Sequence, residues 1–212
     1  MLYEKLKDLS LPEGITIFTA ATFILGISYK FGFYFTGFTD AIWLIKYFSV
    51  LEIMLGTINI FLIYLVTLMI IERSIGNRSI SGAIGGGLLL MFLFSIPAWL
   101  RSGIFPFEIF LTISFSYIAM VFLIKGANKS KVTALTFLLI VIPIMIGANE
   151  SRSLRAENRI PLAIIKDSDL CFEEWRIIDK FSDKAILINF KNKNQNEYKI
   201  VDIKDISKII SK

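Results

Sequence analysis

The chain has 212 residues, of which 55% are hydrophobic and 19% charged, with a mean hydropathy of +0.65 and a formal net charge of +5. An ordinary soluble domain has about 25% charged residues, so the composition argues against a soluble globular protein. The absence of histidine excludes His-dependent catalytic triads, His-ligated zinc or haem, and a histidine pH switch. Cys171 is the only cysteine, which excludes an internal disulfide, a four-cysteine metal site and a CxxC redox pair, and we expect an inert or partly buried thiol.

The charges are distributed unevenly along the chain. Residues 1–149 contain ten Lys and Arg and seven Asp and Glu. The much shorter segment 150–212 contains thirteen Lys and Arg and eleven Asp and Glu. We therefore predict a transmembrane helical domain over residues 1–149 and a soluble C-terminal antiparallel β domain over residues 150–212.

The first part contains five long apolar runs. A membrane-spanning helix needs roughly 20 mainly apolar residues, and a chain of this size cannot enclose five helices that are apolar on all sides in one interior. We therefore predict an α-helical polytopic membrane protein with about five transmembrane helices. The first and fifth runs are the least clear, because Lys30 interrupts one and the other is short and contains Pro143. The five runs are Ile15–Tyr34, Ser49–Ile71, Ile80–Leu100, Phe107–Ile124 and Val132–Asn149.

The segment Gly37–Phe48 separates the first two runs. Thr39 or Asp40 could cap a short helix there, and Trp43 beside Lys46 suits a membrane interface. The alternative is that this segment extends the second span.

Basic residues in the loops predict the orientation. With a cytoplasmic N-terminus, the inner segments contain seven Lys and Arg and the outer loops three, as the positive-inside rule prefers. Five spans then place the C-terminal domain on the outer side. Arg152, Arg155 and Arg159, just past the fifth run, favour the opposite side, and the loss of one weak span would move the domain inside.

The C-terminal part contains short runs rich in β-branched and aromatic residues with hairpin spacing. They predict three or four strands in an antiparallel meander or small open barrel. Such a small domain without a disulfide or metal is marginal, so we expect it to gain stability from another copy, a partner or the membrane-proximal helices, unless it is self-sufficient. The runs are Leu162–Lys166, Trp175–Phe181, Lys184–Lys191, Tyr198–Ile203 and Asp205–Ile210, the last a strand or a short helix.

Three of the polar residues inside the apolar runs are candidate functional residues. We predict an intramembrane polar site formed by Glu52, Asn59 and Glu108, with Lys30 or Lys46 to neutralise Glu52. The alternative is that each glutamate complements the start of its helix. If their helices touch, the two carboxylates could form a pair. Asn59 lies seven residues after Glu52 on nearly the same face, and we expect its amide to bind another helix or a second copy.

Gly82 and Gly86 form a GxxxG pattern in the third run. This pattern lets two helix backbones approach closely and predicts packing or oligomerisation. With Gly85 and Gly87 present, a hinge is the alternative. No GK[ST] follows, so the glycines do not form a phosphate loop.

A basic cluster lies between the fourth and fifth runs. Retention of this loop on the inner side explains it, and contact with lipid headgroups or a partner is the alternative. The cluster consists of Lys125, Lys129 and Lys131.

These features predict a non-enzymatic membrane protein without a cofactor. No nucleophile is paired with a base, no metal cluster is evident, and the alternating charges of the C-terminal part do not favour nucleic acid. We expect the protein to contact membrane lipids, to oligomerise in the bilayer, and to bind a protein partner or sense a signal through its C-terminal domain. Membrane subunits of bacterial defence or immunity systems fit this class by architecture alone. The alternative is a small oligomeric channel or transporter with polar residues of the second span lining the path.

Overall fold

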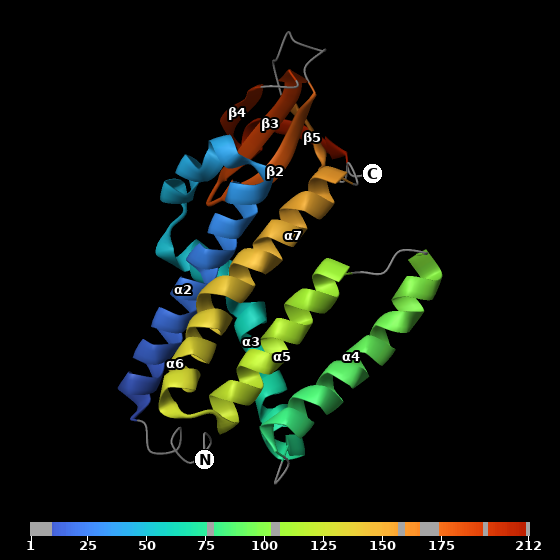
Figure 1. Cartoon of the computed structure of the whole chain (residues 1–212). Helices are drawn as coiled ribbons and strands as arrows, with labels where there is room; N and C mark the ends of the chain where they lie inside the picture. Colours follow the sequence, from blue (N-terminus) through green and yellow to red (C-terminus); the bar gives the residue numbers. More distant parts are fainter. Residues whose placement is uncertain are drawn as a thin grey trace.

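The computed structural model describes residues 10–75, 79–102, 107–156, 160–165, 174–192 and 195–210. Five helical segments in this part of the chain are long and apolar enough to cross a membrane, and an antiparallel sheet follows them (Figure 1). This confirms the predicted arrangement of five long apolar helices followed by a C-terminal antiparallel sheet. The helices are α2 (Leu11–Gly37), α3 (Val50–Ile75), α4 (Ile80–Ser102), α5 (Phe107–Lys125), and a fifth made of α6 (Asn128–Thr136), the π-helical turn η2 (Phe137–Val141) and α7 (Ile142–Ala156).

Local capping explains where α2 begins. The backbone amide and hydroxyl of Ser10 both donate to the Glu13 carboxylate, at 2.9 and 2.6 Å, and Pro12 occupies the first turn. Lys30 does not interrupt the helix, because it lies near the end where its ammonium group reaches the sheet.

The fifth helix passes Pro143 without ending. Proline lacks the N–H that an α-helix requires at that position. The preceding turn is π-helical, and the N–H of Ile142 donates to the carbonyl of Phe137, five residues earlier. This widened turn accommodates the proline. The helix then continues beyond residue 150 to Ala156.

A separate 3-10 helix, η1 (Thr39–Tyr47), connects α2 and α3. It is not an extension of α3, and its N-cap is Phe38 rather than Thr39 or Asp40. Lys46 Nζ lies 5.7 Å from the ring centre of Trp43 and 5.1 Å from that of Tyr47. The two rings are about half exposed.

The sheet has five strands in the order β4-β3-β2-β1-β5. The prediction of three or four strands in a meander was therefore wrong. After the turn η3 (Ile203–Asp205), the last strand crosses to the opposite edge, where Ile206 pairs with Ile165 and joins the small core of the sheet. The strands are β1 (Leu162–Ile165), β2 (Trp175–Phe181), β3 (Lys184–Asn192), β4 (Gln195–Asp202) and β5 (Ile206–Ile210).

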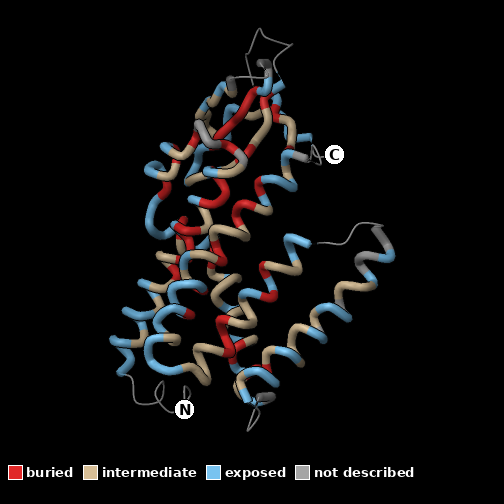
Figure 2. The backbone as a smooth tube through the Cα atoms, viewed as in Figure 1, coloured by how far each residue is buried: buried red, intermediate tan, exposed pale blue. Residues whose placement is uncertain are grey.

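Both faces of β3 are covered, because residues 185–189 are all buried. Ala185 and Leu187 face a small core inside the sheet, which register shifts in three of the strand pairs help to bend. Ile186 and Ile188 face the helices and share a second core with Tyr34 of α2 and with residues of η1. Figure 2 shows buried residues concentrated where the sheet meets the helices. The helix ends therefore cover one face of the sheet. The sequence analysis considered another copy, a partner or the neighbouring helices as sources of stability for the sheet, and these contacts are of the third kind.

Candidate functional site

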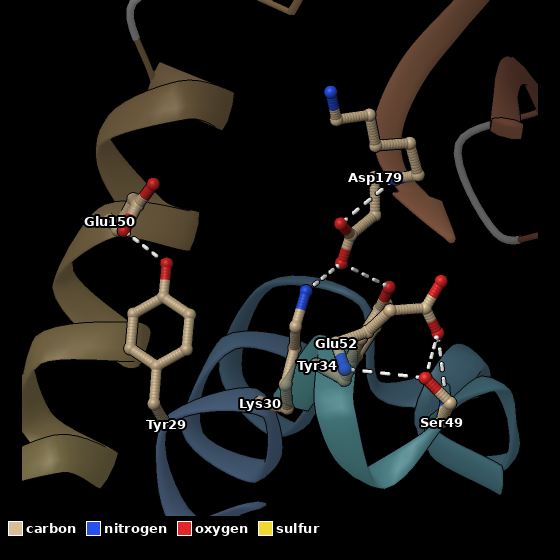
Figure 3. A network of polar contacts seen from close by, with 8 residues as sticks. Tyr29, Lys30, Tyr34, Ser49, Glu52, Glu150 and Asp179 are labelled. Atoms are coloured by element: carbon tan, nitrogen blue, oxygen red, sulfur yellow. Dashed lines mark hydrogen bonds and ion pairs between the residues drawn. The ribbon is translucent and has the colours of Figure 1, made fainter. Parts of the chain in front are cut away.

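A polar network joins α2 to the sheet, 149 residues further along the chain (Figure 3). Lys30 Nζ lies 2.5 Å from the Oδ2 of Asp179 on β2, and the Tyr34 hydroxyl donates to the same oxygen at 2.8 Å. The side chains of Lys30 and Asp179 are only 14% and 15% exposed. Lys30 Nζ also lies 4.2 Å from the centre of the Phe48 ring, which a cation favours.

Local structure brings these groups together. Lys30 and Tyr34 are four residues apart and therefore share one face of α2. On β2 the pairing with β3 shifts register between Ile177 and Asp179. This irregularity lies next to Asp179, and such bulges re-aim side chains.

Glu52 holds a second contact between helix and sheet. Its Oε2 accepts hydrogen bonds from the amide and hydroxyl of Ser49, at 2.7 and 2.9 Å, while the Ser49 hydroxyl accepts from the Glu52 amide. This capping box starts α3. Its Oε1 accepts a hydrogen bond from the amide of Ser182 in the β2–β3 turn. One carboxylate therefore caps a helix and holds the turn.

The third contact of the network joins α2 to α7. The Tyr29 hydroxyl donates to the carboxylate of Glu150. The helices can approach because a Cβ at Gly32 would overlap the backbone of Ile144, and one at Gly147 would overlap the backbone of Tyr29. These glycines lack GxxxG spacing, so the sequence did not single them out.

The structure gives the three predicted polar residues different surroundings. Glu52 bonds to Ser49 and Ser182, whereas Glu108 at the start of α5 forms an ion pair of 2.6 Å with Arg152 of α7. The described contacts therefore do not pair the two carboxylates. Asn59 is exposed on α3, and the structure shows no hydrogen bond for it within the described chain.

Gly82 and Gly86 do not mediate close packing within the described chain. A Cβ at Gly86 would meet no atom within 4 Å, and one at Gly82 would meet only the Ser79 hydroxyl at 3.1 Å. Gly87 instead makes room for the ring of Tyr117, whose hydroxyl donates to the carbonyl of Ala83 at 2.9 Å. This contact fastens α4 to α5.

The predicted basic cluster lies around the α5–α6 turn. Lys129 lines an apolar groove of about 420 Å³ between α5 and the fifth helix. Lys125 ends α5, and Lys131 lies in the first turn of α6. Cys171 lies outside the described residues.

The network holds the sheet against the helices through its hydrogen bonds and ion pair. Its carboxylates are engaged by a lysine, hydroxyls and backbone amides, and no group of three or more potential metal ligands occurs among the described residues. Sequence reasoning named Glu52 and Lys30 but missed Asp179, Tyr34 and Glu150, because no local pattern links them. Comparison of the chain with family models, curated proteins and solved structures found no match.

Proposed function

We propose that this chain is an integral membrane protein whose helices lie in the bilayer. The support is the exposed apolar surface of the helices, including Ile63 (62% exposed) and Met69 (65% exposed) on α3 and Leu89 (61% exposed) on α4. Patches of this extent are unfavourable in water, and lipid covers them. The protein should stay in the membrane pellet after carbonate washing and dissolve only with detergent.

The proposed role of the protein is non-enzymatic: it anchors and oligomerises in the membrane, and its sheet binds a protein partner or senses a signal. The observation that carries this role is the core that the sheet shares with α2, η1 and the start of α3. This core and the ion pair of Lys30 with Asp179 fix the sheet on the helix ends. Binding at the sheet can therefore bias the helices. A membrane subunit of a bacterial defence or immunity system is one example of such a role.

Self-association is proposed at two outward faces. Asn59 of α3 exposes an amide in mid-span, and Gly86 of α4 exposes bare backbone. In hydrocarbon an unpaired amide is unfavourable, and small residues let helices pack closely. A second copy can supply both the hydrogen bond and the packing.

The proposed orientation follows from the path of the helices. α2 runs toward the sheet and α5 runs away from it (Figure 1). Lys125, Lys129 and Lys131 therefore lie at the end remote from the sheet. The positive-inside rule favours the cytoplasm for that end, which places the C-terminal sheet on the outer side.

Affinity purification in mild detergent tests the role. We expect an oligomer by light scattering, with a co-purifying partner. Asn59→Leu and Gly86→Leu should shift the protein toward monomer, while Met69→Leu, on another part of α3, should not. A wild-type monomer without a partner would contradict the proposal. Ion flux in reconstituted vesicles that is abolished by Asn59→Leu would favour the channel instead.

A further inference from the structure

A groove of about 930 Å³ lies among α3, α5 and α7, with Met91 of α4 on its wall. Its walls are mainly apolar and include Ile60 of α3, Ile113 of α5 and Ile146 of α7. The volume is at the upper end of the roughly 300–1,000 Å³ typical of ligand pockets.

The groove is long enough to hold the acyl chain of a lipid in one bilayer leaflet. Its lining on α5 runs from Phe107 to Met120, which is about 20 Å at roughly 1.5 Å per residue. The hydrocarbon of one leaflet is about 15 Å thick, half of roughly 30 Å. An acyl chain that enters beside Phe107 therefore reaches the bilayer centre within the groove.

The charged groups of the groove lie at the end nearer the sheet, together with Thr112 and Asn149. Arg152 Nη1 lies 2.6 Å from Glu108 Oε1, and Asn149 Nδ2 donates to Thr112 Oγ1 at 3.3 Å. Glu150 lines the same end. Because α5 begins at Phe107, this end lies at the level where lipid headgroups meet the hydrocarbon.

The charges at this end select among headgroups. Among the described residues that line this end, two carboxylates, Glu108 and Glu150, accompany one guanidinium, that of Arg152. The next cation along α7, Arg155, lies 5.8 Å from the Phe190 ring of the sheet. A headgroup that adds net negative charge is repelled by this arrangement. A zwitterionic headgroup with a primary ammonium finds a guanidinium for its phosphate and carboxylates for its ammonium.

We propose that this groove binds one phosphatidylethanolamine molecule of the leaflet nearer the sheet. One acyl chain lies between α3 and α5, the phosphate binds Arg152, and the ammonium binds Glu108. The side chains of Arg152 and Glu108 are 53% and 55% exposed. Their pair is therefore weak and accessible, and the headgroup can exchange with it. The inference rests on membrane insertion and adds a specific lipid site to the proposed function.

Native mass spectrometry of the full chain in mild detergent tests the site. Phosphatidylethanolamine and phosphatidylglycerol with identical acyl chains are titrated separately. We expect one tightly bound phosphatidylethanolamine per protomer and about tenfold weaker binding of phosphatidylglycerol, as expected for a lost charge-assisted hydrogen bond. Arg152→Gln should weaken both lipids about tenfold, and Glu108→Gln should remove most of the preference.

Ile113→Trp fills the groove from a position that is already half exposed, and it should abolish the adduct. Lys208→Gln, exposed on β5 and outside the lining of the groove, is the control and should leave binding unchanged. The site is refuted if wild-type protein binds neither lipid, binds both equally, or keeps its adduct in both Ile113→Trp and Arg152→Gln. A dimer that excludes lipid and dissociates in Ile113→Trp would identify the occupant as a second copy and also refute it. Carbonate extraction of the same variants reports membrane insertion separately, so a failed lipid site leaves the proposed function standing.

Discussion

The ion pair between Lys30 and Asp179 should contribute measurably to the attachment of the sheet. Lys30→Met leaves a mostly buried carboxylate whose remaining hydrogen bonds come from the Tyr34 hydroxyl and the backbone amide of Lys180, and it removes the cation from the Phe48 ring. Breaking a fully buried pair costs about 3–5 kcal/mol, whereas an exposed pair contributes about 0–1 kcal/mol. With both side chains about one-seventh exposed, we expect a loss of about 2–3 kcal/mol in the free energy of opening the junction.

A double-mutant cycle isolates the interaction. Asp179→Asn alone leaves the ammonium group of Lys30 without its carboxylate partner. The combination with Lys30→Met leaves no unpaired charge at this position. The double variant should therefore lose less than the sum of the single variants, with a coupling of about 1–2 kcal/mol.

Hydrogen exchange of the buried β3 amides at Ile186 and Ile188, measured in nanodiscs, reports the opening. A loss of about 2 kcal/mol accelerates exchange roughly 30-fold. Lys204→Met is the control, because Lys204 pairs with Asp202 at 3.3 Å while 78% exposed, and it should change the opening energy by less than about 0.5 kcal/mol. Exchange rates in Lys30→Met equal to those of the wild type would refute the reasoning. So would a double variant whose loss of stability equals the sum of the losses in Lys30→Met and Asp179→Asn.

Three further outcomes follow from the structure. Gly147→Ala places a Cβ against the backbone of α2 and should destabilise the pair of α2 and α7 by about 1–3 kcal/mol, measured as a lower unfolding midpoint in detergent. Gly85→Ala is the control, because its Cβ meets no atom within 4 Å, and it should not destabilise the protein. Ser182→Gly should raise the stability of the sheet by up to about 1 kcal/mol, because Ser182 has a φ of 49° and glycine keeps the amide that binds Glu52; unchanged or faster hydrogen exchange of the hairpin would count against this. In a chain whose native cysteine is replaced, an impermeant thiol reagent should label Lys208→Cys on intact cells but Lys129→Cys only after permeabilisation, and the reverse pattern would invert the proposed orientation.

The candidate site shows how far local patterns reach. Glu52 and Lys30 stand out in the sequence because a charge in an apolar run is unusual, and Ser49 with Glu52 forms a local capping box. The partner of Lys30 could not be predicted, because Asp179 lies 149 residues away on a strand whose register is shifted. The ion pair of Glu108 could not be predicted either, because its partner Arg152 lies on another helix.

The positions of the helices and of most strands could be predicted from local patterns. The length of an apolar run and the alternation of β-branched residues are local properties, so the predicted spans and strands overlap the observed ones closely. Which elements contact one another depends on the packing of the folded chain. Gly32 and Gly147 bring two helices together while Gly82 and Gly86 remain open, and β5 crosses the sheet to pair with β1. A local pattern specifies that a face is small or apolar, but the identity of the surface that covers it depends on how the whole chain packs.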